Sequence, residues 1–135
     1  MKKYFAACMF LAINVSAQAE VAVIVNPSNG AAIDKDAIAK IYLGKTKSFS
    51  DGTKVNAVGL NSGSSVDEFT TSVLGKSSSQ YKAYWSKLIF TGKGTPPEAL
   101  DNEQAVIDFV AANADAIGYV DSAKVTDNVK VVGKF

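Results

Sequence analysis

Apolar residues along the chain form short runs, separated by longer stretches in which apolar and polar residues recur at helical spacing. The first run, Val21 to Val25, is continuous, and its lack of polar alternation is typical of a strand buried on both faces of a largely parallel sheet. The pattern predicts three further strands: Val55 to Leu60, Ile117 to Val120 and Val129 to Val132.

The first two strands are separated by a stretch that predicts a short amphipathic helix. Asp34 to Leu43 carries apolar residues at helical spacing, with acidic residues at the N-terminal end, where they complement the helix dipole. Gly44 is placed to end this helix. A second helix is predicted to begin at Ser65, which fits a capping box with Glu68, and to end at Gly75.

Two more helices are predicted in the second half of the chain. The serines at 77–79 are typical of a linker and N-cap, and Asp101 with Gln104 at the capping-box position begins the fourth helix. The third helix carries an aromatic face beside lysines, which fits either a nucleic-acid platform or a buried core stripe. Its helical spacing and the chain's balanced charge favour the core stripe, formed by Tyr81, Tyr84, Trp85, Leu88 and Ile89.

Strands that alternate with helices predict an α/β fold, a three-layer sandwich with a mostly parallel or mixed sheet. In such sheets, ligands bind where strand ends meet helix N-termini, and two strand-to-loop turns fit this rule, Asn26 to Gly30 and Asn61 to Ser65. The second turn is rich in Ser and Gly. It precedes a predicted helix whose first N–H groups have no partner inside the helix, so it is a candidate oxyanion cradle.

The first nineteen residues have the pattern of a secretory signal peptide. Lys2 and Lys3 precede the apolar segment Tyr4 to Val15, and Ala17-Gln18-Ala19 is a small-residue cleavage site. Cleavage after Ala19 leaves residues 20–135 as one α/β domain, which we expect to be periplasmic or secreted. The apolar segment is too short for a membrane span, so we expect no membrane insertion.

Composition removes several classes of chemistry. Histidine is absent, all fourteen basic residues are lysine, and the only cysteine, Cys8, lies in the signal segment. Cys8 weakly resembles the cysteine of a lipoprotein cleavage box, but it precedes most of the apolar segment that such a box should follow. Without His or Cys in residues 20–135, there is no Ser-His-Asp or Cys-His nucleophile and no zinc site of the usual ligand types.

The remaining residue types give no signal of catalysis. A Ser-Lys dyad or a paired-carboxylate hydrolase stays open, but no spacing indicates either, so we expect a non-enzyme without a metal or cofactor. Gly92-Lys93-Gly94 lacks the spacing of a nucleotide-binding P-loop. The net charge is +1, and removing Lys2 and Lys3 changes it to −1, so a nucleic-acid partner is not expected.

Several strings, in this order and spacing, resemble the phosphate-binding subunit of phosphate ABC transporters, which has the type II periplasmic binding-protein fold. Residues 38–45 are similar to the family's helix-ending "IFLGK" element, and residues 116–120 are similar to its "GAIGYV" strand. Shorter matches complete the register: Asp51-Gly52, Phe69 to Leu74, and Tyr84-Trp85 to Gly94. The resemblance extends from Val21 to Val120 and corresponds to about the middle lobe of the family.

The resemblance implies a phosphate ligand and an ABC permease as partner. It places Ser62, Gly63, Ser64 and Ser65 where the family's Ser-Gly-Thr turn presents hydroxyl and backbone N–H groups to phosphate. It also places Asn26 and Ser28 after the first strand, near the ligand. This chain lacks the arginine that the family has near the serine turn and offers Leu60 and Asp67 there instead.

Two functions follow from these patterns. The first is an exported solute-binding module that takes phosphate or another small oxyanion weakly, with a dissociation constant of about 1 mM, at Ser62 to Ser65. The second is a non-catalytic periplasmic domain that has lost ligand capture and associates with a partner or a second copy of itself. The missing second lobe motivates the second function, because the surface that faced it would be free to pair.

Overall fold

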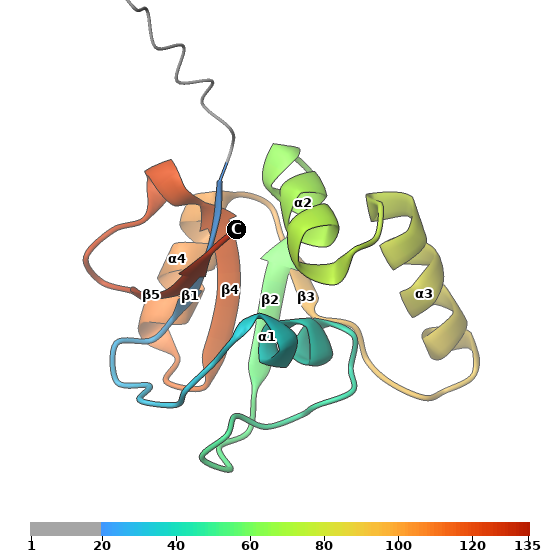
Figure 1. Cartoon of the computed structure of the whole chain (residues 1–135), viewed down its shortest axis with the longest axis horizontal. Coiled ribbons are helices and arrows are strands. Elements are labelled where there is room, and N and C mark those ends of the chain that lie inside the picture. The colour runs from blue at the N-terminus through green and yellow to red at the C-terminus, as the bar shows by residue number, and fades with distance from the viewer. Residues whose placement is uncertain (1–19) are drawn as a thin grey trace, which may run out of the picture.

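The computed structural model describes residues 20–135, which form a five-stranded sheet between two layers of helices (Figure 1). The predicted signal peptide, its cleavage after Ala19 and Cys8 lie outside the described residues. In chain order the elements are β1 (Val21–Val25), α1 (Lys35–Tyr42), β2 (Asn56–Leu60), α2 (Ser64–Phe69), a π-helical turn η1 (Thr70–Leu74), α3 (Ser78–Phe90), β3 (Glu98–Leu100), α4 (Glu103–Ala112), β4 (Ala116–Asp121), a 3-10 turn η2 (Ser122–Lys124) and β5 (Lys130–Lys134).

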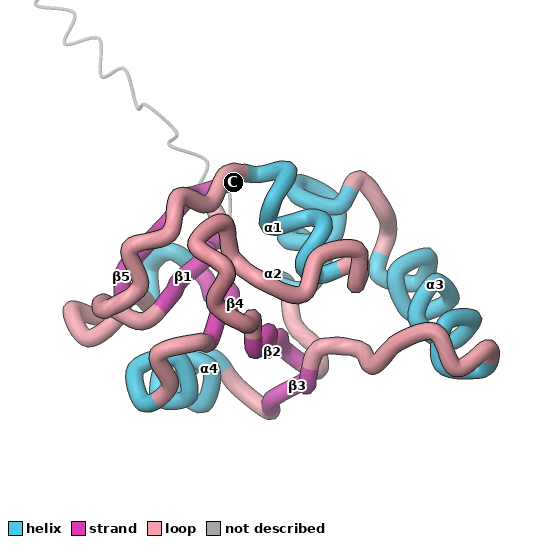
Figure 2. Tube along the Cα trace, turned by 90° about the horizontal axis from the view of Figure 1, so that it is seen from below, coloured by secondary structure: helices cyan, strands magenta, loops and turns pink. Residues whose placement is uncertain are grey.

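The sheet is mixed, with the strand order β3-β2-β4-β1-β5. Figure 2 shows α1 and α2 on one side of it and α4 on the other, which confirms the three-layer α/β fold. β2 runs parallel to β3 and β4, whereas β1 runs antiparallel to β4 and β5. The four predicted strands are all present, with ends within two residues of the prediction. No sequence pattern predicted β3, because this strand has three residues and two of them are exposed.

The direction of β1 corrects one prediction. All five of its residues are buried, as predicted, but its neighbours are antiparallel rather than parallel: Val21 pairs with Asp121, and Val25 with Ile117. A continuous apolar run indicates that both faces of a strand are buried. Here helices cover both faces of the sheet, so β1 is buried although it runs antiparallel to its neighbours. The C-terminal end of β1 therefore lies beside the N-terminal end of β4.

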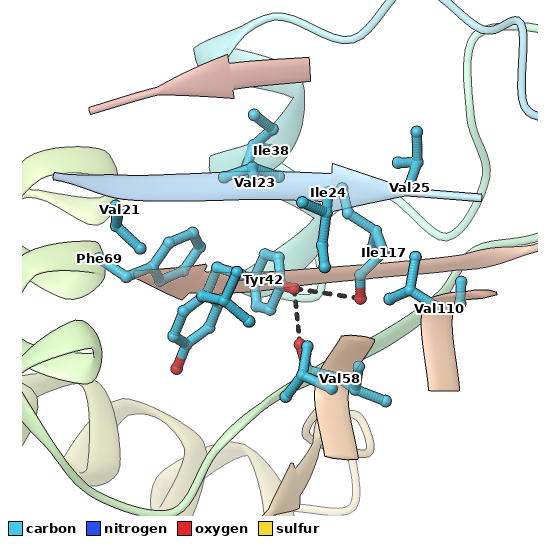
Figure 3. Close-up of a cluster of buried hydrophobic side chains, with 14 of the residues drawn as sticks. Val21, Val23, Ile24, Val25, Ile38, Tyr42, Val58, Phe69, Val110 and Ile117 are labelled. Carbon is cyan, nitrogen blue, oxygen red and sulfur yellow. Dashed lines mark hydrogen bonds between the residues drawn. The ribbon is translucent and has the colours of Figure 1, made fainter. Parts of the chain in front are cut away.

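The core is centred on β1 and the aromatic side chain of Tyr42 at the end of α1 (Figure 3). The Tyr42 hydroxyl donates a hydrogen bond to the Val58 carbonyl at 2.7 Å and lies 3.3 Å from the Ile117 carbonyl. Its ring packs edge-on against Phe69 and Tyr119, which stack on each other with centroids 4.0 Å apart. Complete burial raises the pKa of Tyr42 well above its usual value, so it is a neutral hydrogen-bond donor that joins α1 to the sheet.

Helix α3 lies to one side of the sheet rather than over either face (Figure 1, Figure 2). Its predicted buried stripe is therefore partly wrong: Trp85 is buried, Tyr81, Tyr84 and Leu88 are half-buried, and Ile89 is 54% exposed. The helical spacing of apolar residues predicts which face of a helix packs against the protein. It does not predict how much of that face the neighbouring elements cover.

Three side chains attach α3 to the C-terminal end of α1. The Tyr81 hydroxyl and the Trp85 indole N–H both donate to the Tyr42 carbonyl, at 3.1 and 3.0 Å. The Tyr84 hydroxyl donates to the Leu43 carbonyl at 2.7 Å. Carbonyls at a helix C-terminus lack partners inside the helix, so these donors satisfy them. We call this set, together with Gly44, the α1–α3 junction.

Helix ends follow local sequence signals in most places. Asp34 caps α1 by accepting from the Ala37 N–H at 2.8 Å, and Ser77 with Gln80 forms a capping box for α3. Gly75, with φ +67°, ends η1 as predicted. The predicted cap of α4 is off by one residue, because Asn102 rather than Asp101 accepts from the N–H of the third helical residue.

None of the helices in residues 20–135 is both long enough and apolar enough to cross a membrane.

Candidate functional site

The candidate site is the turn from Asn61 to Ser65, which joins the C-terminal end of β2 to the start of α2. Gly63 is the N-cap of α2, with φ +110°, and no side chain caps the helix. The predicted capping box of Ser65 and Glu68 is therefore wrong. Ser65 lies inside the helix, and its buried hydroxyl donates to Glu103 Oε2 at 3.3 Å. Gly63 adopts a positive φ that glycine tolerates and has no side chain to cap the helix, so the helix end is left open within residues 20–135.

Backbone N–H groups at this helix end lack hydrogen-bond acceptors within the described residues. Among residues 20–135, no acceptor is paired with the N–H of Ser62, Gly63, Ser64 or Ser65, whereas the N–H of Val66 donates to the Gly63 carbonyl at 3.2 Å. Residues 62–64 are exposed. Unpaired N–H groups at the positive end of a helix are the usual donors to an oxyanion.

Beneath the turn, the end of β2 rests on the Tyr119 side chain. The Leu60 N–H donates to the Tyr119 hydroxyl at 3.3 Å, and burial raises the pKa of Tyr119 above its usual value. Gly59 permits this approach, because a Cβ there would lie 3.0 Å from the Tyr119 hydroxyl oxygen. The turn is thus held by a rigid, neutral support from β4.

Carboxylates lie beside the turn. Asn61 Nδ2 donates to Asp101 Oδ1 at 2.9 Å, and Glu103 Oε2 accepts from both the Ser65 hydroxyl and the Asp121 N–H. Asp67, in the first turn of α2, accepts from the Ser78 hydroxyl. Within residues 20–135, no group of three or more His, Cys, Asp or Glu side chains is placed to hold a metal ion. These negative charges oppose the attraction of the helix end for an anion.

In the other predicted turn, Asn26 to Gly30, the side chains of Asn26 and Ser28 form hydrogen bonds within the protein. Asn26 Nδ2 donates to the Val110 and Ala111 carbonyls, both at 3.0 Å, and so caps the C-terminal end of α4. Its Oδ1 accepts from the N–H and the hydroxyl of Ser28, at 3.0 and 2.7 Å. Both residues therefore have their hydrogen-bonding groups engaged within the protein.

The structure places the two turns at opposite ends of the sheet. Glu103, at the start of α4, contacts Ser65, whereas Val110 and Ala111, at the end of α4, contact Asn26. The separation follows from the antiparallel direction of β1, whose C-terminal end points away from that of β2. Ser62, Gly63, Ser64 and Ser65 are thus adjacent to one another, but Asn26 and Ser28 are not part of the same surface.

Sequence reasoning missed four residues around the turn: Tyr119, Asp101, Glu103 and Asp121. Asp121 contributes its backbone N–H, which donates to Glu103 Oε2, and not its carboxylate. A signal for the two carboxylates, Asp101 and Glu103, exists, because residues 98–128 contain seven acidic residues and one lysine. Their position beside Ser65 depends on the parallel pairing of β2 with β3 and β4, which no local pattern encodes.

This chain is similar to known proteins in its structure. No protein-family model matches the chain, and no curated protein matches its sequence. Among solved structures, an ABC-type phosphate transport receptor from Vibrio cholerae has a TM-score of 0.63 at 17% identity. A phosphate ABC transporter substrate-binding protein from Clostridium perfringens, with bound phosphate, has a TM-score of 0.63 at 20% identity. PstS from Borrelia burgdorferi has a TM-score of 0.55 at 14% identity.

The matches cover 84% of this chain but only 46%, 45% and 47% of these three proteins. The chain thus spans less than half the length of each, and at such identities the likeness concerns the fold alone. These neighbours are binding proteins of transport systems rather than enzymes. The chain has the α/β fold of a single lobe of a periplasmic binding protein.

Proposed function

We propose that this protein is an exported solute-binding module that takes phosphate or a similar small oxyanion weakly at the Asn61–Ser65 turn, for an ABC uptake system. The ligand groups are the backbone N–H groups of Ser62, Gly63, Ser64 and Ser65 and the free hydroxyls of Ser62 and Ser64. Ser65 contributes through its backbone only, since its hydroxyl is bonded to Glu103.

One observation carries this proposal: within residues 20–135, the helix end at Gly63 has no side-chain cap and its adjacent N–H groups have no acceptors. A helix end is normally capped by its own residues, and an open end that is rigidly supported is suited to an anion from solution. The fold shared with phosphate-binding transport proteins supports the same ligand class.

The charges around the turn set the expected affinity. No arginine is present in the chain, and Asp67, Asp101 and Glu103 lie close to the turn. Without a guanidinium and with carboxylates nearby, a hydrated anion gains little on binding. We expect a dissociation constant of about 1 mM or weaker for phosphate.

The test is a phosphate titration of residues 20–135 at constant ionic strength, followed by the backbone amide signals in ¹H–¹⁵N NMR spectra. The amides of residues 62–65 should shift with a saturable curve, and chloride at equal ionic strength should leave them unchanged. Absence of any shift in these amides at tens of millimolar phosphate and sulfate contradicts the proposal.

Two variants make the test specific. Replacing Ser62 and Ser64 together by alanine removes two hydroxyl donors and should weaken binding about threefold to tenfold. Ser28→Ala is the matched control, because it removes a serine hydroxyl at the far end of the sheet and should leave the affinity unchanged. Asp67→Asn removes a repelling charge near the helix end and should tighten binding about twofold to fivefold.

A second function, association with a partner or a second copy, is favoured by the exposed apolar end of α3. Phe90 is 93% exposed and Ile89 is 54% exposed, and they are the large apolar residues that residues 20–135 leave exposed. Light scattering after size-exclusion chromatography tests self-association, with Phe90→Ser as the variant. A monomer of unchanged mass at every concentration up to about 1 mM contradicts self-association.

A further inference from the structure

A cleft of about 510 Å³ opens at the N-terminal ends of β2 and β3, the end of the sheet opposite the Asn61–Ser65 turn. It lies between the end of α1, the chain leading into β2, and the loop between α3 and β3. Its volume is that of a site for a small organic molecule. Much of its wall is apolar, formed by Ile41, Val55, Ala57, Trp85, Pro96 and Pro97.

Two glycines allow the backbone to lie directly against the Trp85 indole ring in this wall. A Cβ on Gly44 would lie 2.7 Å from Trp85 Cη2, and a Cβ on Gly94 would lie 3.3 Å from Trp85 Cζ3. Both glycines also line the cleft. A side chain at Gly44 would collide with the ring, and one at Gly94 would crowd it. The two glycines therefore cover most of the indole ring, which is 5% exposed, and a small part of it lines the cleft.

The charges of the cleft favour an anion. Lys47 and Lys54 are exposed and line it, and Glu98 is the carboxylate that faces them from β3. The carbonyls at the end of α1 form the negative end of the helix dipole, and hydrogen bonds from α3 side chains to the Tyr42 and Leu43 carbonyls reduce the repulsion that this end exerts on an anion. The Lys40 carbonyl likewise accepts from the Lys45 N–H at 2.8 Å. Two cations therefore outnumber one carboxylate at the rim of an apolar volume.

We propose that this cleft is a second binding site, independent of the oxyanion site, and that it takes a small carboxylate with an apolar body. The apolar part of the ligand lies against the proline loop, Pro96 and Pro97, beside the small exposed part of Trp85, and the carboxylate lies toward Lys47 and Lys54. Such a division between an apolar wall and a few charged groups is how small-molecule sites fix the orientation of a ligand. This inference does not depend on phosphate binding at the turn.

The lone tryptophan gives a direct measurement, because Trp85 is the only one in the chain. Phenylacetate, phenylacetamide and acetate are titrated into residues 20–135, and Trp85 fluorescence and the single indole N–H signal in NMR spectra are followed. Phenylacetate should change both with a dissociation constant of about 1 mM, as expected for a ligand of this size. Phenylacetamide and acetate should bind at least fivefold more weakly, since one lacks the charge and the other the ring.

Charge-matched variants assign the binding to the cleft. Lys47→Ser with Lys54→Ser should weaken phenylacetate binding about tenfold, given the modest strength of exposed ion pairs. Lys82→Ser with Lys87→Ser removes the same charge from α3, outside the lining of the cleft, and should change the affinity less than twofold. Equal weakening by the two double variants, equal binding of phenylacetamide, or no change in the Trp85 signals would each overturn the proposal.

Discussion

The α1–α3 junction and the Asn61–Ser65 turn are both built on the end of a helix, and they differ in how that end is satisfied. At the junction, three side chains of α3 donate to the last carbonyls of α1. At the turn, four consecutive N–H groups at the start of α2 have no acceptor within residues 20–135. One helix end is completed by the protein itself, and the other is left available to solvent or a ligand.

The strings that resemble the phosphate-binding family lie in the junction and in the sheet. The string at residues 38–45 contains Tyr42, Leu43 and Gly44, and the string beginning at Tyr84-Trp85 supplies their partners, so both belong to the junction. The string at residues 116–120 is the buried strand β4. These strings therefore coincide with residues that hold the lobe together, and they do not include the Asn61–Ser65 turn.

The largest effect should come from placing a side chain in the junction. Gly44 has φ +75°, and a Cβ there would lie 2.7 Å from the Trp85 ring. Gly44→Ala should lower the free energy of unfolding by about 2–4 kcal/mol, from backbone strain and overpacking together. Urea unfolding followed by circular dichroism measures it.

Gly75→Ala is the matched control for this substitution. Gly75 has φ +67°, but no atom lies within 4 Å of its Cβ position. Gly75→Ala should therefore lower the free energy of unfolding by about 1 kcal/mol, from backbone strain alone. If the two variants lose the same stability, contact with Trp85 does not constrain residue 44, and the close packing attributed to the junction is wrong.

A smaller effect is expected from the Tyr42 hydroxyl, which joins the end of α1 to the sheet. Tyr42→Phe removes its hydrogen bond to the Val58 carbonyl and should cost about 1–2 kcal/mol at neutral pH. The substitution keeps the ring and its contacts with Phe69 and Tyr119, so the loss isolates the hydroxyl.

The same variant should change the response to alkaline pH. Burial raises the pKa of Tyr42 above the unfolded value of 10.0, so its contribution to stability is complete below pH 10 and is lost as pH rises above it. Between pH 10 and 11 the wild type should lose stability faster than Tyr42→Phe, by up to about 1.4 kcal/mol per pH unit. Parallel curves of unfolding free energy against pH would show that Tyr42 does not titrate in this way.

The smallest effects are expected at the turn. Ser62→Ala and Ser64→Ala should each change the free energy of unfolding by less than about 0.5 kcal/mol, because both serines are exposed. Ser65→Ala should cost about 1 kcal/mol, because its hydroxyl is buried and bonded to Glu103. Thermal unfolding of the three variants gives the ranking, and a large loss in Ser62→Ala or Ser64→Ala would mean that those side chains stabilise the fold.

The sequence by itself determined the elements and many of their ends. The buried run Val21 to Val25, the cap at Asp34, the capping box at Ser77 and the stop at Gly75 all depend on interactions within a few residues. Side-chain burial of a strand, a hydrogen bond to the third N–H of a helix and a glycine in the left-handed region are local properties. The α/β fold followed from their order.

The tertiary structure alone decided the direction of β1, and with it the separation of Asn26 and Ser28 from the serine turn. It also decided that Glu103 and Asp101 lie beside that turn. It placed α3 to one side of the sheet, where Phe90 is exposed. Strand direction and helix placement depend on contacts between residues far apart in the chain, and an apolar run or a helical period has the same appearance in either arrangement. The pattern therefore located a serine-rich helix end, and the tertiary structure placed Asp101 and Glu103 beside it.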